Sequence, residues 1–327
     1  MDDRVLILNG RENTMSDEIL IMRPLSPLGL EAAEKLGTVH NYYGAEDKAA
    51  LLDQVADRIG YVATDAGVGF TMEMADRMPN LKFVSCYGVG YDGLPIKELA
   101  ERGVPVTNTP GVLNDAVAEL AVGMMLALAR RIPRIDAGVR NGEWKKSEIM
   151  LTGQLAGSKA GIIGLGRIGK EIASRLIPMK VDVSYHGRSE QADAPYTYYG
   201  DLTEMARNVD WIICITPGGA GTKHIVNKQV LEALGPQGAV VNVARGSVID
   251  EQALVDALKS GAVGGAALDV FEAEPNPHPD LMAMENVVLQ AHQGSATVAT
   301  RTAMAQLVLD NIADHIAGRP LKTQVMP

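Results

Sequence analysis

The chain has few cysteines and no metal-binding pattern. Cys86 and Cys214 are the only cysteines among 327 residues, and no CxxC pair or Cys/His cluster occurs. The histidines lack HExxH-like spacing as well, so no metal site is predicted. Each cysteine lies in an apolar stretch typical of a buried strand. We therefore expect structural thiols in a protein from a reducing compartment.

Long hydrophobic runs and blocks of like charge are missing too. The longest apolar run, Leu120–Ala129, is too short to span a bilayer, which takes about 20 residues. The opening residues, MDDRVLILNG, are acidic and do not resemble a signal peptide. The formal net charge is −10, and no basic block would attract a nucleic acid. We expect a cytoplasmic protein with neither a membrane nor a nucleic-acid partner.

Aromatic residues make up only 4% of the chain, but 46% of the residues are hydrophobic, which allows an aliphatic core in two domains. Apolar segments alternate with helical patterns in two series. The first series has predicted strands at 4–8, 60–64 and 81–86 and helices at 28–36, 48–56 and 71–77. The second has strands at 159–163, 181–185, 211–215, 239–243, 265–270 and 287–290 and helices at 168–176 and 251–260. Near-continuous apolar strands predict parallel sheets covered on both faces.

Two further helices are predicted outside these series. One is apolar almost all round from Val117 to Ala129, with Asn114 or Asp115 as its cap. Such a helix must be buried on every side, between domains, between subunits or both. The other is amphipathic and covers residues 295–318.

The segment GLGRIG, residues 164–169, matches the GxGxxG fingerprint. An apolar strand leads into it and a helix follows, which is the context that dinucleotide binding requires. Gly164 allows the tight turn, Gly166 lets the backbone approach a pyrophosphate, and Gly169 lets the helix pack on the strand. The helix N-terminus offers N–H groups to the phosphates.

An acidic residue is missing where an NAD enzyme usually has one, about 20 residues beyond the fingerprint. The sequence there offers His186, Gly187, Arg188 and Ser189. A guanidinium and a hydroxyl favour the 2′-phosphate of NADP, which a carboxylate would repel. The alternative is that Arg188 is a solvated loop residue, that Glu190 turns inward, and that NAD binds.

Three later strands each end close to one ionisable residue. Arg245 lies in NVARGSVID, Glu274 in ALDVFEAEP and His292 in AHQGSAT. Ligands of open α/β sheets bind at the carboxyl ends of strands. His292 can donate a proton to an alkoxide, a carboxylate can orient its ring, and Arg245 can bind a substrate carboxylate through paired hydrogen bonds. Each residue alone has an ordinary structural explanation, and the combination predicts carbonyl reduction.

With these motifs the chain resembles the D-2-hydroxyacid dehydrogenases, and most closely their NADP-using glyoxylate/hydroxypyruvate reductase branch. CYGVGYDGLP, NTPGVLNDAVAE, GLGRIG, SYHGRS, NVARGSVID, ALDVFEAEP and AHQGSAT occur in the order of that family. The resemblance implies an α/β protein with a Rossmann-type, doubly wound parallel sheet and a smaller flavodoxin-like domain. The implied substrate domain is 1–106, completed by a C-terminal helix at 295–327, and the dinucleotide domain is 107–294. A homodimer with the 115–130 helix in its interface is also implied.

The resemblance also implies roles for individual residues. Arg245 would bind the 2-oxo acid, and His292 would be the acid/base paired with Glu274. Val89 and Gly90 would offer N–H groups to the substrate carboxylate, and Asp269 would hold the nicotinamide carboxamide. Further implied cofactor contacts are Val89, Leu165, Arg167, Ile168, Thr216, Pro217, Val243, Ala244, Arg245, His292 and Gly294.

Two positions depart from the family pattern. Ala291 replaces a frequent proline, and Gln293 replaces a small or apolar residue. The expectation is a less rigid loop or an added polar contact. Tyr87 is hypothesised to line the substrate pocket and to favour small acids.

The sequence therefore predicts an NADPH-dependent reductase of a small 2-oxo acid, with glyoxylate or hydroxypyruvate favoured as substrate. One alternative is an NAD-dependent dehydrogenase of another 2-hydroxy acid. The other is a nucleotide-sensing binding protein, similar to the corepressors that share this fold.

Overall fold

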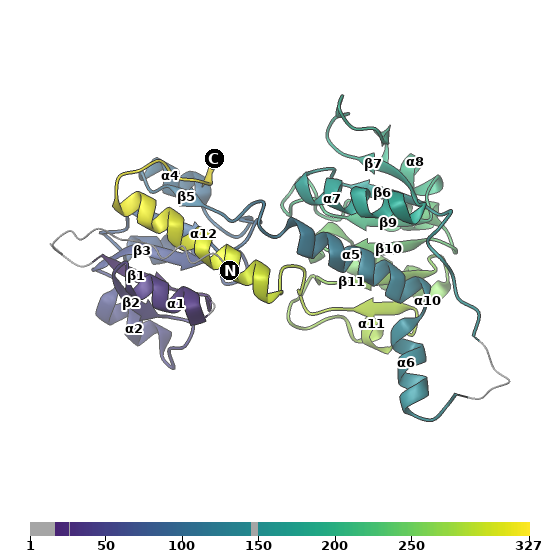
Figure 1. Ribbon diagram of the computed structural model, residues 1–327, viewed down its shortest axis with the longest axis horizontal. Helices are drawn as coiled ribbons and strands as arrows, with labels where there is room; N and C mark the ends of the chain where they lie inside the picture. Colours follow the sequence, from purple (N-terminus) through teal and green to yellow (C-terminus); the bar gives the residue numbers. More distant parts are fainter. Residues whose placement is uncertain (1–16, 26, 145–149) are drawn as a thin grey trace. The chain divides into compact units, whose positions relative to one another are not determined.

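The computed structural model describes residues 17–25, 27–144 and 150–327 (Figure 1). The chain divides into two compact units, residues 1–109 with 302–327, and residues 110–301. The strand predicted at 4–8 lies outside the described residues. Within the described part of the chain, no helix combines the length and the apolar character needed to cross a membrane.

The first unit contains a six-stranded sheet in the order β13-β5-β4-β3-β1-β2. Its first five strands in sequence are parallel and follow the flavodoxin-like order, as predicted. The strands are β1 (Glu18–Ile21), β2 (Thr38–Asn41), β3 (Ile59–Thr64), β4 (Phe83–Cys86), β5 (Val106–Thr107) and β13 (Gln324–Val325). The helices are α1 (Pro27–Glu34), α2 (Lys48–Val55), α3 (Met72–Asp76), α4 (Ile96–Glu101) and most of α12 (Val298–Ile316).

The second unit contains a seven-stranded parallel sheet in the order β12-β11-β10-β9-β6-β7-β8. This is the doubly wound dinucleotide-binding order, extended by one strand, and it confirms the predicted fold class. The strands are β6 (Lys159–Ile163), β7 (Asp182–His186), β8 (Thr197–Tyr199), β9 (Trp211–Cys214), β10 (Ala239–Asn242), β11 (Gly265–Leu268) and β12 (Val287–Leu289). The α-helices are α5 (Asn114–Ala129), α6 (Ile132–Arg140), α7 (Arg167–Leu176), α8 (Leu202–Arg207), α9 (Lys228–Leu234), α10 (Glu251–Ser260) and α11 (Pro279–Ala283).

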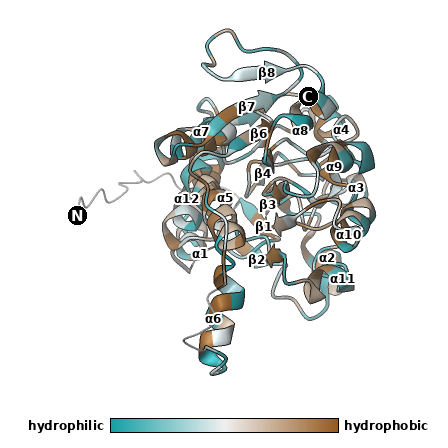
Figure 2. Ribbon diagram, turned by 90° about the vertical axis from the view of Figure 1, so that its right-hand side faces the viewer, coloured by the Kyte–Doolittle hydropathy of each residue, from teal (hydrophilic) through white to brown (hydrophobic). Residues whose placement is uncertain are grey.

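Local sequence explains where several of these helices begin. Asp47, Thr71, Asp201, Asn227 and Asp250 each cap a helix with a side-chain oxygen that accepts a backbone N–H. Their helices show mixed hydrophobic and hydrophilic colouring, as expected for elements that cover a sheet (Figure 2). Each unit has its own buried aliphatic cluster, and the two cysteines are buried in β4 and β9.

The structure corrects two details at helix ends. Neither Asn114 nor Asp115 caps α5, because the capping residue is Leu113 and makes no side-chain hydrogen bond. Asp115 instead forms an ion pair with Arg175 of α7. The C-terminal helix does not reach residue 327: α12 ends at Ile316, and β13 then pairs antiparallel with β5.

The apolar helix α5 is buried along one side, where it contacts α7, β10, β11 and β12. Its other side lines a groove in the second unit with a volume of about 420 Å³. The lining residues are Leu120, Gly123, Met124, Ala127, Pro133, Leu281, Met282, Met284, Val287, Val288, Leu289 and Gln290. Within the second unit, α5 is therefore not buried on every side, and its burial between domains or subunits stays a prediction.

Candidate active site

The fingerprint loop between β6 and α7 fits a dinucleotide pyrophosphate. Gly164 has a φ of 98°, and a Cβ there would lie 3.0 Å from the Ile215 carbonyl oxygen. A Cβ on Gly169 would lie 2.4 Å from the Gly164 carbonyl oxygen, so both positions require glycine. Nothing lies within 4 Å of a Cβ built on Gly166, which caps α7 without a side chain. The α7 N-terminus is thus open to an anion.

The loop after β9 adjoins this fingerprint. A Cβ on Gly164 would approach the Cα of Thr216 to 3.0 Å. Strands β6 and β9 are neighbours, and the strand order reverses at this point of the sheet. Ligands of doubly wound sheets bind at such a switch point. Thr216 and Pro217 therefore lie beside the fingerprint loop, and their cofactor contacts stay a prediction.

The loop that carries Arg188 is braced from two sides. Tyr198 of β8 donates to the Gly187 carbonyl oxygen at 3.1 Å. Gln191 donates its backbone N–H to the Tyr185 hydroxyl at 2.7 Å and its side-chain amide to the Leu165 carbonyl oxygen at 2.8 Å. Gln191 thus ties this loop to the fingerprint loop, a role that the sequence did not reveal.

The side chains of this loop differ in their contacts and in their exposure to solvent. His186 donates from Nδ1 to the Tyr199 carbonyl oxygen at 2.9 Å, so this nitrogen is committed to β8. Arg188, Ser189 and Glu190 are exposed. A guanidinium and a hydroxyl on a braced, exposed loop are available for a phosphate, and Glu190 is exposed beside them.

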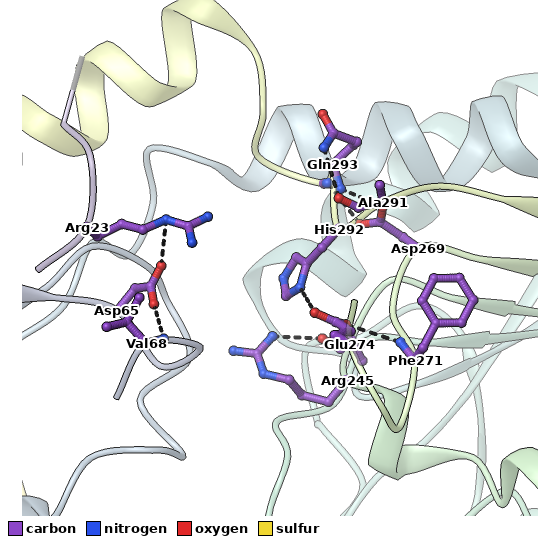
Figure 3. Close-up of polar contacts among 12 residues, drawn as sticks. Arg23, Asp65, Val68, Arg245, Asp269, Phe271, Glu274, Ala291, His292 and Gln293 are labelled. Carbon is purple, nitrogen blue, oxygen red and sulfur yellow. Dashed lines mark hydrogen bonds and ion pairs between the residues drawn. The ribbon is translucent and has the colours of Figure 1, made fainter. Parts of the chain in front are cut away.

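The predicted catalytic pair is formed in the second unit (Figure 3). His292 donates from Nδ1 to Glu274 Oε2 at 2.8 Å. Glu274 also accepts the Phe271 backbone N–H on Oε1 at 3.1 Å, which fixes its carboxylate. Because Nδ1 is engaged, Nε2 is the ring nitrogen able to exchange a proton with a substrate oxygen.

The charge state of Glu274 suits this pairing. Burial acts to raise the pKa of the Glu274 carboxyl. The His292 hydrogen bond and charge, the Phe271 N–H and the Arg245 charge outweigh burial, so the pKa of Glu274 is lowered. Glu274 is therefore ionised at neutral pH and can stabilise an imidazolium.

Asp269 holds the segment that carries His292. Its carbonyl oxygen accepts the His292 N–H at 2.8 Å, and its carboxylate oxygens accept the N–H groups of Gln293 at 2.6 Å and Gly294 at 2.9 Å. Burial raises the pKa of Asp269 against the opposing effect of these two N–H groups. Three consecutive bonds hold His292 in its left-handed conformation, with a φ of 55°.

This arrangement bears on the two departures from the family pattern. Asp269 fixes the backbone even though Ala291 replaces proline. The Gln293 side chain donates to the Ala291 carbonyl oxygen at 2.9 Å, which is the added polar contact that was one of the two expectations.

Arg245 follows β10 on a tightly packed turn. Asn242 donates to the Arg245 carbonyl oxygen at 2.9 Å and accepts the Ala244 N–H at 3.0 Å. A Cβ on Gly246 would lie 1.9 Å from the Phe271 carbonyl carbon, so this turn packs against the segment that leads to Glu274. The close approach places Arg245 near Glu274, whose pKa it helps to lower.

A second histidine–glutamate pair braces the same turn and was missed in the sequence. His224 has a left-handed φ of 52°, donates its N–H to the Ser247 carbonyl oxygen at 2.8 Å and pairs through Nε2 with Glu272. No local sequence pattern distinguishes Glu272 from an ordinary loop residue, and this is why the pair could not be predicted.

Val89 and Gly90 belong to the first unit, on the loop after β4. Asn108 donates to the Val89 carbonyl oxygen at 2.9 Å, and the Cys86 thiol donates to the Gly90 carbonyl oxygen at 3.4 Å. Tyr87 is 4% exposed and donates its N–H to the Thr64 carbonyl oxygen at 2.6 Å. The loop is thus fixed within its unit, and the role of Tyr87 in a substrate pocket stays a prediction.

Two other kinds of reactive group would be a metal-ligand cluster and the thiol of Cys214, which is buried. Within the residues that the structure describes, no three His, Cys, Asp or Glu side chains are grouped to hold a metal ion. Burial raises the pKa of the Cys214 thiol to about 12, so this thiol stays protonated and unreactive.

The chain is similar to known proteins in sequence and in fold. Residues 122–294 match the sequence model of the D-isomer specific 2-hydroxyacid dehydrogenase, NAD binding domain. The chain is 41% identical to glyoxylate/hydroxypyruvate reductase A HPR2 of Arabidopsis thaliana, over 94% of this chain and 98% of that protein. It is 38% identical to 2-ketogluconate reductase of Gluconobacter oxydans, over 94% and 98% of the two chains.

A solved structure is similar over nearly its whole length. This is the NADPH-dependent glyoxylate/hydroxypyruvate reductase of Sinorhizobium meliloti in complex with NADP and malonate, with a TM-score of 0.87 and 37% identity over 95% of this chain and 97% of that chain. The protein is therefore an oxidoreductase with an NAD(P)-binding domain. It belongs to the D-isomer specific 2-hydroxyacid dehydrogenase family, which acts on small 2-hydroxy and 2-oxo acids.

Proposed function

We propose that the protein reduces a small 2-oxo acid to the D-2-hydroxy acid with NADPH. The observation that carries the proposal is the hydrogen bond of 2.8 Å between His292 Nδ1 and Glu274 Oε2, on a segment held by Asp269. A histidine oriented by an ionised carboxylate is suited to deliver a proton to a developing alkoxide.

Each residue of the site has a part in this reaction. NADPH supplies the hydride for the carbonyl carbon when it is bound. His292 protonates the carbonyl oxygen through Nε2, and Glu274 stabilises the imidazolium from which this proton comes. Arg245 binds the substrate carboxylate and polarises the carbonyl group. Val89 and Gly90 add backbone N–H groups to that carboxylate.

The choice of NADPH is supported by the braced loop after β7. Arg188 and Ser189 are exposed there, and the first carboxylate after the strand is that of Glu190. The similar Sinorhizobium meliloti enzyme is described as NADPH-dependent and was solved with NADP. Asp269 is assigned to the nicotinamide carboxamide, in addition to its bonds within the His292 segment.

The substrates that we favour are glyoxylate and hydroxypyruvate. They are small acids, and the Arabidopsis thaliana relative carries both in its name. The cytoplasmic location and the homodimer predicted from the sequence form part of the same proposal. The apolar groove beside α5 supports the homodimer, because a second chain would remove its surface from water.

The test is initial-rate oxidation of NADPH and of NADH with each of these two acids. We expect turnover of both acids and a kcat/KM for NADPH at least about tenfold above that for NADH, because one charge-assisted contact to the 2′-phosphate accounts for such a ratio. Equal kcat/KM values for the two cofactors would contradict the role of Arg188 in selecting NADPH, but not the proposed reaction. Absence of turnover with any 2-oxo acid would contradict the proposed reaction.

A further inference from the structure

Arg23 and Asp65 form an ion pair at the carboxyl edge of the sheet in the first unit. Arg23 lies just beyond β1, and Asp65 directly follows the neighbouring strand β3. Arg23 Nε is 3.0 Å from Asp65 Oδ2, and the side chains are 44% and 14% exposed (Figure 3). Two charged groups thus stand at the edge where open parallel sheets bind ligands.

The pair is held in place by its own unit. The Asp65 carboxylate also accepts the Val68 N–H on Oδ1 at 2.7 Å, and its carbonyl oxygen accepts the Gly69 N–H at 2.8 Å. Thr64 donates its hydroxyl to the Gly69 carbonyl oxygen at 2.9 Å. The 65–69 turn is therefore held by hydrogen bonds of its own, and Asp65 presents its second oxygen, Oδ2, to Arg23.

The 65–69 turn touches the loop assigned to the substrate carboxylate. A Cβ on Gly93 would lie 2.4 Å from the Ala66 carbonyl oxygen, so the 87–93 loop packs directly on the turn. Strand β3 separates β1 from β4, and adjacent strands lie about 4.8 Å apart. The long side chain of Arg23 can span the distance from the end of β1 to the end of β3. A ligand held by Val89 and Gly90 would therefore lie beside the turn that carries Asp65.

We propose that Arg23 and Asp65 form a subsite for the hydroxyl groups that a 2-oxo acid carries beyond its carbonyl carbon. The proposal rests on the proposed function, because it extends the site assigned to Val89 and Gly90. The paired side chains have no net charge together, so they do not favour a second carboxylate. A guanidinium that donates and a carboxylate that accepts match the two hydrogen-bonding directions of a hydroxyl group.

This subsite predicts a difference between substrates. Glyoxylate has no carbon beyond the carbonyl, and pyruvate has only a methyl group there. Hydroxypyruvate has one hydroxyl in that position, and 2-ketogluconate has several. Sites built to bond a hydroxyl discriminate against analogues that lack it, because their polar groups then lose a partner.

The experiment measures kcat/KM for these four acids with the wild-type chain and with Arg23→Gln and Asp65→Asn. We expect Arg23→Gln to lower the value about tenfold for hydroxypyruvate and 2-ketogluconate, and to leave glyoxylate and pyruvate within about twofold. Asp65→Asn keeps the Oδ1 acceptor for Val68 and removes the charge. It should show the same selectivity with an unchanged thermal midpoint.

The matched control is Arg58→Gln. Arg58 Nε lies 2.8 Å from Glu18, with side-chain exposures of 50% and 13%, but this pair is at the opposite edge of the same sheet. The Arg58→Gln variant should leave the kcat/KM for all four acids unchanged. Equal losses of kcat/KM for all four acids in Arg23→Gln and Asp65→Asn, or no loss in either variant, would overturn the subsite. Reduction of glyoxylate by the wild type would still support the proposed reaction in that case. A wild type that reduces none of the acids would overturn both.

Discussion

Glu274 does two things at the scale of the single residue. Its carboxylate orients the His292 ring, and it supplies a negative charge at neutral pH because the fold lowers the pKa of this carboxyl. The sequence predicted the pair because each residue lies shortly after an apolar strand. The hydrogen bonds that Asp269 accepts from Gln293 and Gly294 could not be predicted, since no sequence pattern indicates the left-handed turn at His292.

Replacing Glu274 with glutamine should lower kcat about 100-fold, because the imidazolium loses its carboxylate partner. NADPH affinity, measured by fluorescence titration, should change less than about twofold. Glu232→Gln is a suitable control, because that carboxylate lies on the exposed surface of α9 and forms an ion pair with Lys228 of the same helix at 3.7 Å. A Glu274→Gln enzyme with wild-type kcat would remove Glu274 from the mechanism.

The same variant tests the pKa shift. A lowered pKa in the folded state means that ionised Glu274 stabilises folding above its ordinary pKa, and that this contribution disappears as the pH falls through the lowered value. The thermal midpoint of the wild type should therefore exceed that of Glu274→Gln at about pH 7, and the difference should shrink toward about pH 3. A constant difference over this range would argue against a depressed pKa.

At the scale of the element, strand prediction depended on apolar runs. Strand β6 and helix α10 have the predicted bounds, because a buried apolar run and an Asp250 cap define them. Strands β2 and β8 were missed, since they are short and their residues are partly exposed. Strand β13 is two residues long and exists through its pairing with β5, which no local pattern reports.

The missed strand β8 has a functional consequence for its neighbour. Tyr198 and Tyr199 of β8 hold the loop after β7 through the carbonyl oxygen of Gly187 and the ring of His186. The loop is thus presented by two strands and by Gln191. If the proposed NADPH preference holds, these contacts would position the loop for the 2′-phosphate before the cofactor binds.

Arg188→Leu should weaken NADPH binding about tenfold or more and change NADH binding less than about twofold, because only NADPH carries the 2′-phosphate. The dissociation constants can be measured by fluorescence titration without turnover. Arg207→Leu, at the end of α8, is the control for loss of a positive charge elsewhere in the same unit. Parallel losses for the two cofactors would show that Arg188 does not contact the phosphate.

At the scale of the whole molecule, apolar surface remains outside the two cores. Besides the groove beside α5, helix α6 exposes Ile132, Ile135 and Val139, at 51%, 38% and 50%. Their spacing places them on one face of the helix, and hydrophobic residues recur along α6 in Figure 2. Exposed apolar side chains on both α5 and α6 are typical of a surface that a partner chain covers.

If a second copy covers this surface, a charge in its centre should separate the copies. Val139→Glu should convert a dimer to a monomer at micromolar concentration, because burying an unpaired carboxylate is strongly unfavourable. Ile177→Glu is the matched control, since Ile177 is 47% exposed in the same unit but lies in the short helix after α7. Light scattering coupled to size-exclusion chromatography gives the mass directly. A wild type that is monomeric, or a Val139→Glu chain that stays dimeric, would show that α6 does not carry the interface, and the apolar face would then require a different partner.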